Sequence, residues 1–254
     1  MTGSKSTPAH RGLWSSRMAF ILAATGSAVG LGNIWKFPYV TGENGGGAFV
    51  LVYLLCIAIV GIPIMMAEVY IGRSGRHNPI TSFRLVAERN LASPVWRISA
   101  IVGVLAAFII LSFYSVIGGW AASYVGHAAM GDFTGQSADA IGELFGGLLA
   151  SPVTLLIWHT IFMALVILVV ARGLKSGLER AVTILMPALF VLLLVAVGYA
   201  TTTGHFGEAV SFLFTPDFGA LTMDGVLVAL GHAFFTLSLG MAIMMAYGSY
   251  LGND

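Results

Sequence analysis

Residues 26–38 read GSAVGLGNIWKFP and lie within the first long apolar stretch of the chain. This segment holds three glycines, Asn33 and Lys36 where a membrane-spanning helix normally carries apolar side chains. Glycine weakens a helix, and a backbone group left unpaired inside a bilayer carries a large free-energy cost. Such a break is tolerated only where protein, water, an ion or a ligand satisfies the freed groups. The stretch therefore predicts a broken helix with a binding site at the break.

Close helix packing is the alternative explanation for the three glycines, because small residues also let membrane helices approach one another. Asn33 and Lys36 favour the binding site, since polar residues inside a membrane are costly and usually functional. The last long apolar stretch, residues 225–251, is interrupted by TLSLG at 236–240, which predicts a second broken helix. Freed carbonyls, the Asn33 amide and the Thr236 hydroxyl offer hard oxygen atoms for Na+, and freed N–H groups suit a carboxylate.

The composition excludes an ordinary soluble domain. Of the 254 residues, 57% are hydrophobic and 9% are charged, and the mean hydropathy is +0.90. A helix needs about 20 apolar residues to cross a bilayer. Six stretches meet this length: 17–39, 46–71, 98–126, 152–171, 181–203 and 225–251. The first lacks the pattern of a cleavable signal peptide and is expected to remain in the mature protein.

The basic residues predict the orientation in the membrane. If the N-terminus lies in the cytoplasm, eleven of the twelve Lys and Arg residues fall in the tail or in cytoplasmic loops. The twelfth, Lys36, lies in the first apolar stretch, and the outer loops carry acids such as Asp132 and Glu208. This asymmetry predicts a multi-pass protein of the plasma membrane with its N-terminus inside. A nucleic-acid-binding role is improbable for arginines on such short loops.

The segments between the spans carry weaker signals. Residues 1–16 are expected to form a cytoplasmic tail, 127–151 an outer loop rich in glycine and acids, and 204–224 an extracellular loop that acts as a lid. ITSFRLVAERN, between Pro79 and Pro94, predicts a short helix at the inner membrane interface. Pro187 predicts a structural bend in the fifth span. The single cysteine, Cys56, excludes an intrachain disulfide.

Five motifs closely resemble the neurotransmitter:sodium symporter family, particularly its bacterial amino-acid transporters. They are GSAVGLGNIWKFPYVTGENGGGAF (26–49), GIPIMMAEVYIGR (61–73), KSGLERA (175–181), FLFTPDF (212–218) and GHAFFTLSLGMAIMMAYGSY (231–250). The resemblance implies an all-α leucine-transporter-like fold of two inverted five-helix repeats, with helices 1 and 6 broken. Residues 17–203 would form the first repeat and 225–254 the sixth helix, so this chain would cover one repeat and one helix of the second.

The resemblance also implies a sodium and substrate site at the two breaks. One sodium would bind Ala28, Asn33 and Thr236, and a second would bind Gly26 and Val29 together with groups from the absent second repeat. The substrate carboxylate would meet Leu31, Gly32 and Tyr114, and its amino group would meet oxygens of Ala28, Phe235, Thr236 and Ser238. The side-chain pocket would be lined by Ser27, Ile110, Phe235 and Met241. Gly30 leaves room for an amino acid's own carboxylate, and Met241 suggests a bulky hydrophobic or aromatic side chain.

Gates and an anion site follow from the same resemblance. Lys36 would begin the outer gate, whereas the inner gate would include Arg11, Trp14, Ser249 and Tyr250. A chloride site would involve Tyr53, His232, Thr236 and Ser238, but the family usually has Gln where His232 stands, so chloride dependence is left open. Glu68 matches a glutamate that hydrogen-bonds the unwound part of helix 6.

The expected function is Na+-coupled symport of an amino acid by alternating access. One alternative is a truncated membrane fragment that transports nothing by itself and needs its second repeat or a full-length parent. A channel is a nearer competitor than an enzyme, because broken helices also occur in pores. The sequence has no nucleotide-binding glycine loop, metal-spaced His/Cys set or catalytic Ser/His/Asp arrangement outside its apolar spans.

Overall fold

The computed structural model describes residues 12–252, which form helices and contain no strand. Four helices in this part are long and apolar enough to cross a membrane: Gly47–Gly75, Pro94–Met130, Pro152–Ala171 and Leu174–Ala200. Arg17–Ala28 and Gly32–Glu43 form a fifth span if they are taken as one helix bent by 49°. The predicted all-α membrane architecture is confirmed.

Both predicted breaks are present. Helix α1 (Arg17–Ala28) ends where Val29 adopts an extended conformation, with φ −93° and ψ 102°. The chain re-enters a helix through a π-helical turn at Gly32–Lys36, followed by α2 (Phe37–Glu43). The sixth predicted span is divided into α11 (Met223–Thr236) and α12 (Ile243–Gly248), and each part alone is too short to cross a bilayer.

The second break has an unusual backbone. Three residues between α11 and α12 lie in the left-handed region, with φ of 55° at Ser238, 74° at Gly240 and 60° at Ala242. This region suits glycine but strains other residues, so the serine and the alanine persist only because surrounding contacts hold them. The backbone strain therefore coincides with the segment for which the sequence predicts a site.

Short polar residues set where several helices begin. Their side-chain oxygens accept hydrogen bonds from backbone N–H groups of the first helical turn, which would otherwise have no partner. These capping residues are Ser16 of α1, Asn78 of α5 (Pro79–Arg89), Ser137 of α7 (Ala138–Ala150), Ser151 of α8 (Pro152–Ala171) and Thr222 of α11. The short helix predicted between Pro79 and Pro94 is present as α5.

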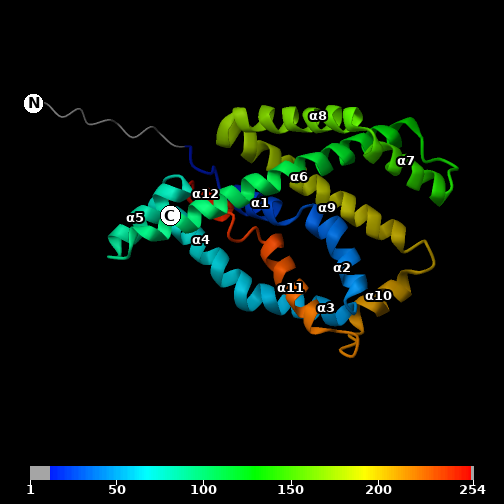
Figure 1. The fold of residues 1–254 in the computed structure, drawn as a ribbon, viewed down its shortest axis with the longest axis horizontal. Coiled ribbons are helices and arrows are strands. Elements are labelled where there is room, and N and C mark those ends of the chain that lie inside the picture. Colours follow the sequence, from blue (N-terminus) through cyan, green and yellow to red (C-terminus); the bar gives the residue numbers. More distant parts are fainter. Residues whose placement is uncertain (1–11, 253–254) are drawn as a thin grey trace, which may run out of the picture. The chain divides into compact units, whose positions relative to one another are not determined.

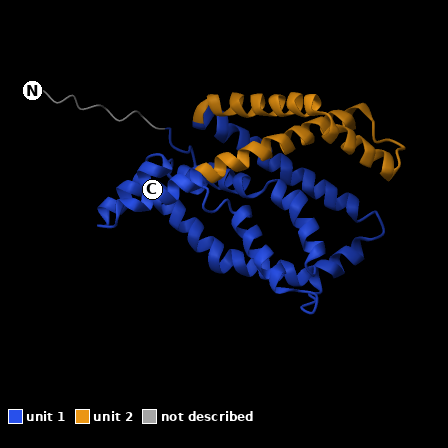
Figure 2. Cartoon of the chain, viewed as in Figure 1, with its two compact units in different colours: residues 1–104, 174–254 blue, residues 105–173 orange. Residues whose placement is uncertain are grey.

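The chain divides into two compact units (Figure 2). The first comprises residues 1–104 and 174–254. In it, α3 (Gly47–Cys56) continues through a π-helical turn at Ile57–Gly61 into α4 (Ile62–Gly75). Helix α11 packs along α3 and α12 along α4 (Figure 1). Glycine permits the second contact, because a Cβ atom on Gly248 would lie 2.5 Å from the Val69 carbonyl oxygen.

Two buried apolar clusters stabilise this unit. The outer cluster consists of Val40, Phe49, Tyr53, Ala229 and Ala233, from α2, α3 and α11. The inner cluster consists of Trp14, Ala19 and Ala23. Partly buried residues of α1, of the π-helical turn Leu174–Glu179, of α9 (Arg180–Ala200) and of the segment from α12 to Leu251 pack against it. The two clusters lie on helices that flank the breaks, so the breaks are supported by packed helices and not by loops alone.

The second unit comprises residues 105–173. Helix α6 (Arg97–Met130) runs into it, and α7 and α8 complete it. Helix α6 packs closely on α8, since a Cβ atom on Gly119 would lie 2.8 Å from the His159 backbone nitrogen. The expectation of a loop at 127–151 is wrong over most of that range, because Ala138–Ala150 is helical behind the Ser137 cap. Glycine and acid content concealed an amphipathic helix.

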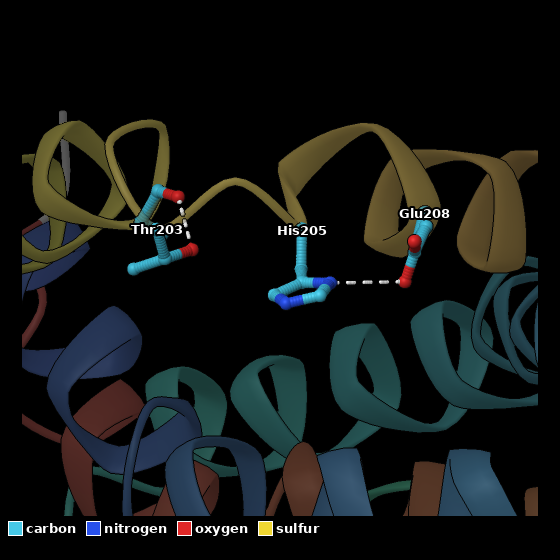
Figure 3. Close-up of polar contacts among 4 residues, drawn as sticks. Thr203, His205 and Glu208 are labelled. Carbon is cyan, nitrogen blue, oxygen red and sulfur yellow. Dashed lines mark hydrogen bonds and ion pairs between the residues drawn. The ribbon is translucent and has the colours of Figure 1, made fainter.

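The outer loop at 204–224 is also partly helical. Helix α9 continues through Pro187 and ends at Ala200, and α10 (Phe206–Phe214) follows. The Thr203 hydroxyl donates to the Ala200 carbonyl, while His205 Nδ1 lies 3.2 Å from Glu208 Oε2 at the start of α10 (Figure 3). Both side chains of the His205–Glu208 pair are about 80% exposed, so the pair marks this turn but adds little stability.

Candidate functional site

A chain of hydrogen bonds joins the two breaks. The Asn33 amide donates to the Ala28 carbonyl over 3.1 Å, at the end of α1. The Thr236 hydroxyl donates to Asn33 Oδ1 over 3.0 Å, and the Tyr53 hydroxyl donates to Thr236 over 3.1 Å. Thr236 is buried at the last residue of α11. The three residues that the resemblance implies for one sodium therefore lie together in one chain of hydrogen bonds.

A second connection runs between the breaks through two serines. Ser238 Oγ donates to the Ser27 carbonyl over 3.1 Å, and Ser27 Oγ donates to Ser238 Oγ over 3.2 Å. Ser238 is 5% exposed, and its backbone adopts the left-handed conformation. The hydrogen bonds to Ser27 explain how a residue other than glycine is held in that conformation. Residues expected to contact the substrate thus also fix the geometry of the second break.

Glu68 of α4 holds the second break from its other side. The Gly240 backbone N–H donates to Glu68 Oε1 over 2.7 Å, which is the contact that the resemblance implies. The carboxyl group is 5% exposed, and its Oε2 atom has no hydrogen-bond partner among the described residues. Gly240 is suited to this position because its φ is 74°. The acid therefore satisfies a backbone group that the interrupted helix leaves free.

Aromatic rings cover Gly32. A Cβ atom on this glycine would lie 2.7 Å from the Phe235 ring, so any other residue here would force the ring to move. The His232 ring lies 5.3 Å from Phe37 and 5.7 Å from Tyr53, centroid to centroid. His232 Nε2 is buried with no hydrogen-bond partner among the described residues. Tyr53, His232, Thr236 and Ser238, the residues implied for chloride, are all at least 90% buried.

The remaining predicted site residues fall into three groups. Gly26 and Val29 lie at the end of α1, and a Cβ atom on Gly26 would lie 3.1 Å from the Met186 sulfur of α9. Leu31 directly precedes the π-helical turn, and Met241 lies half-buried within the second break. Ile110 and Tyr114 lie one helical turn apart on the part of α6 in the second unit. Within the first unit, the predicted pocket residues thus lie at or beside the two breaks.

The predicted gate residues differ in their burial and in their hydrogen-bond partners. Lys36 is exposed, and its Nζ lies 5.0 Å above the Tyr39 ring. At the other end of α1, the Trp14 backbone N–H donates to the Tyr250 carbonyl over 3.1 Å. Ser249 is buried, and its hydroxyl donates to the Ala246 carbonyl within its own helix. Arg11 lies outside the described residues.

Two residues at the inner end were missed by the sequence analysis. The Trp14 indole N–H donates to the Tyr247 carbonyl over 3.0 Å, and the two rings meet edge to face. Glu179 accepts hydrogen bonds from both the backbone and the side chain of Ser15. The signal available was the acid in KSGLERA at the inner end of the fifth span. Its partner could not be identified because it lies 164 positions away along the chain.

The chemistry of the site is defined by neutral oxygen donors. Carbonyl, amide and hydroxyl oxygens of Ala28, Asn33 and Thr236 lie along one chain of hydrogen bonds at the end of α1, and such hard ligands suit hard cations. The C-terminal end of α1 adds the negative end of a helix dipole. The next helical segment begins at Gly32, where backbone N–H groups suit a carboxylate. One region can therefore accept a small cation beside an anionic group.

Comparison with known proteins supports the interpretation of this region as a sodium site. A sequence model of the "Sodium:neurotransmitter symporter family" matches residues 11–140. The chain is 45% identical over 238 residues to the uncharacterized sodium-dependent transporter YhdH of Bacillus subtilis, covering 94% of this chain and 52% of that relative. An uncharacterized sodium-dependent transporter of Haemophilus influenzae is 35% identical over 251 residues, covering 96% and 55%.

A solved structure agrees in fold. The crystal structure of MhsT in complex with L-phenylalanine superimposes with a TM-score of 0.86 at 48% sequence identity, covering 96% of this chain and 55% of that chain. The chain thus spans about half the length of the relatives it matches, which corresponds to the first repeat and one helix of the leucine-transporter-like fold. By its matched family model, its relatives and its broken helices, the chain belongs to the sodium:neurotransmitter symporter family.

Proposed function

We propose that this chain forms the first half of a Na+-coupled amino-acid symporter. The observation that carries the proposal is the oxygen cluster of Ala28, Asn33 and Thr236 between two broken helices. Its relatives are described as sodium-dependent transporters, and one structural neighbour binds L-phenylalanine. The proposed protein crosses the plasma membrane with its N-terminus inside, because the basic residues concentrate on that side.

The proposed roles follow the two breaks. Na+ binds Ala28, Asn33 and Thr236, and the substrate carboxylate lies against the backbone N–H groups of Leu31 and Gly32. A second Na+ binds the carbonyls of Gly26 and Val29 with groups from the other half. The remaining proposed contacts with the amino acid come from Ser27, Ile110, Tyr114, Phe235, Ser238 and Met241.

Substrate class and anion dependence are finer parts of the proposal. A hydrophobic or aromatic amino acid is favoured by Met241, whose thioether adapts to bulky groups, and by the L-phenylalanine bound to the neighbour. Tyr53 and His232 line the proposed anion region, but Tyr53 already donates to Thr236. We therefore propose that Na+ is required and that chloride has at most a modulatory effect.

The second half of the fold supplies the rest of the site. Because the relatives are about twice as long as this chain, we propose that the transporting unit contains further helices, encoded in the same frame or supplied by a partner chain. A 254-residue chain acting alone would then be a membrane fragment without transport activity. Nucleotide sequence beyond codon 254 distinguishes an open frame from a half-protein.

The test is uptake of L-[3H]phenylalanine by proteoliposomes that contain the product of the complete reading frame. We expect accumulation that requires an inward Na+ gradient and is abolished when K+ replaces Na+ or an ionophore dissipates the gradient. The same vesicles with the 254-residue chain alone should accumulate none. Equal uptake in Na+ and K+ would contradict sodium coupling, and uptake by the short chain alone would contradict its proposed incompleteness.

A further inference from the structure

We propose that Glu179 is a positioning residue that latches the inner end of α1 to α9 and so sets how readily the site opens to the cytoplasm. The latch is the contact between Ser15 and Glu179. The Ser15 backbone N–H donates to Glu179 Oε2 over 3.1 Å, and the Ser15 hydroxyl donates to Oε1. Both oxygens of one carboxylate are thus engaged by a single residue. This inference rests on the proposed function, because alternating access requires the site to open to the cytoplasm.

The latch joins two segments that are far apart in the sequence. Ser15 directly precedes Ser16, which caps α1. Glu179 ends the π-helical turn at Leu174–Glu179 and directly precedes α9. A carboxylate beside the start of α1 is favoured by the helix dipole, and hydrogen bonds to a charged acceptor are stronger than neutral ones. The position of α1 relative to α9 therefore depends on this acid.

Helix α1 has two inner neighbours, and they hold it differently. Towards α12, the Trp14 backbone and indole N–H groups donate to the carbonyls of Tyr250 and Tyr247, and the rings pack edge to face. Towards α9, a Cβ atom on Gly26 of α1 would lie 3.1 Å from the Met186 sulfur, and Ala19 and Ala23 lie in the same buried apolar cluster as Val182 of α9. The interface with α12 is the better bonded of the two.

A water path from the cytoplasm to Ala28 requires α1 to separate from one of these neighbours. We infer that the interface with α9 opens, because the latch that closes it among the described residues depends on a single carboxylate. A cavity of about 470 Å³ lies beside it, lined by Trp14, Ser15, Ser16, Arg17, Arg73, Leu251 and Gly252. Water from this cavity can replace Ser15 as a partner of the carboxylate. The latch can therefore break without leaving a charge unsatisfied.

The test uses a cysteine reporter inside the inner cluster, the buried apolar cluster that α1 shares with α9. In the product of the complete reading frame, all native cysteines including Cys56 are replaced by serine, and Ala19, which is 5% exposed, becomes Ala19→Cys. Inside-out vesicles are treated with a membrane-impermeant maleimide. We expect Glu179→Gln to label about tenfold faster, the effect of losing about 1.4 kcal/mol. Ser15→Ala should produce a smaller rise, because its backbone N–H still donates.

A double variant and two controls separate a latch from general loosening. Ser15→Ala combined with Glu179→Gln should label no faster than Glu179→Gln alone, since both changes break one contact. Glu88→Gln, at an exposed ion pair on α5, should leave labelling unchanged. A reporter at Ala229→Cys in the outer cluster should not respond to Glu179→Gln. Faster labelling at both reporters would overturn the proposal in favour of a merely structural role.

The labelling and the proposed function can fail separately. Unchanged labelling of Ala19→Cys in Glu179→Gln, with normal Na+-driven L-phenylalanine uptake, would overturn the latch and leave the symporter proposal intact. Absent uptake in the unmodified protein, with labelling that still responds to Glu179→Gln, would support the contact as a latch and contradict the transport function. Each outcome is read from the same vesicle preparation.

Discussion

Thr236 is the residue that ties the two breaks together. Its hydroxyl accepts a hydrogen bond from Tyr53 and donates one to Asn33, so its donor and one of its two acceptor positions are used. The side chain is 6% exposed. A hydroxyl in that position has to be either fully bonded or bound to a ligand, because an unpaired buried polar group is destabilising. The same oxygen can thus serve the fold and a cation.

Replacing this hydroxyl should weaken sodium binding. Thr236→Val keeps the shape of the side chain but leaves Tyr53 and Asn33 each short of one partner. We expect the Na+ concentration that half-saturates L-phenylalanine binding to rise by about tenfold or more, as for a loss of about 1.4 kcal/mol. The measurement is a Na+ titration of amino-acid binding to the product of the complete reading frame.

The matched control is Thr236→Ser, which retains the hydroxyl and removes only a methyl group. It should keep a Na+ requirement close to that of the unmodified protein. If Thr236→Val and Thr236→Ser behave alike, the hydroxyl does not contribute to the cation site.

At the scale of elements, glycines fix how closely helices pack around the second break. Gly248 of α12 lies against α4, where an added Cβ would lie 2.5 Å from the Val69 carbonyl oxygen. A backbone atom cannot move aside as the end of a side chain can. Gly231 of α11 is different, because a Cβ there would meet nothing within 4 Å. The two glycines therefore serve as a matched pair.

Alanine at these two glycines should have opposite effects on stability. Gly248→Ala should destabilise the protein by about 1–3 kcal/mol, because it overpacks the α4–α12 contact. Gly231→Ala should stabilise it by about 0.5–1 kcal/mol, because alanine favours a helix interior. Thermal unfolding in detergent measures both changes. A higher unfolding midpoint for Gly248→Ala would show that the two helices are not in close contact.

The elements also show what sequence alone can predict. The two breaks were predictable, because Gly26, Gly30 and Gly32 and the TLSLG stretch are local signals of a weakened helix. Helix α7 was not, because its glycines and acids resemble a loop and its amphipathic pattern is short. The bond between Ser15 and Glu179 was not predictable either, since no local pattern links residues 164 positions apart. Local composition predicts where a helix breaks and leaves backbone groups unpaired. The structure is needed to identify hydrogen bonds between residues that are far apart in the sequence.

At the scale of the whole molecule, the distribution of charge predicts which ends of the helices face the cytoplasm. Thr203 lies in the loop before α10 (Figure 3), and Ala92 lies after α5. Each is replaced by cysteine, as Thr203→Cys or Ala92→Cys, in a protein whose native cysteines are replaced by serine. Both positions are exposed. We expect a membrane-impermeant maleimide to label Thr203→Cys in intact cells.

Ala92→Cys should react only after the cells are opened. The opposite pattern would reverse the orientation, and labelling of both positions in intact cells would contradict a membrane span between them.

The central claim is that a cation and an amino acid share one site formed by the two breaks. Its most direct test is equilibrium binding of L-phenylalanine to the product of the complete reading frame at increasing Na+ concentrations. Binding of one ligand must strengthen binding of the other by the same factor. We expect that Na+ raises the affinity for L-phenylalanine, that L-phenylalanine raises the affinity for Na+ equally, and that Asn33→Ala abolishes both effects. An L-phenylalanine affinity that is the same in Na+ and in K+ would contradict it.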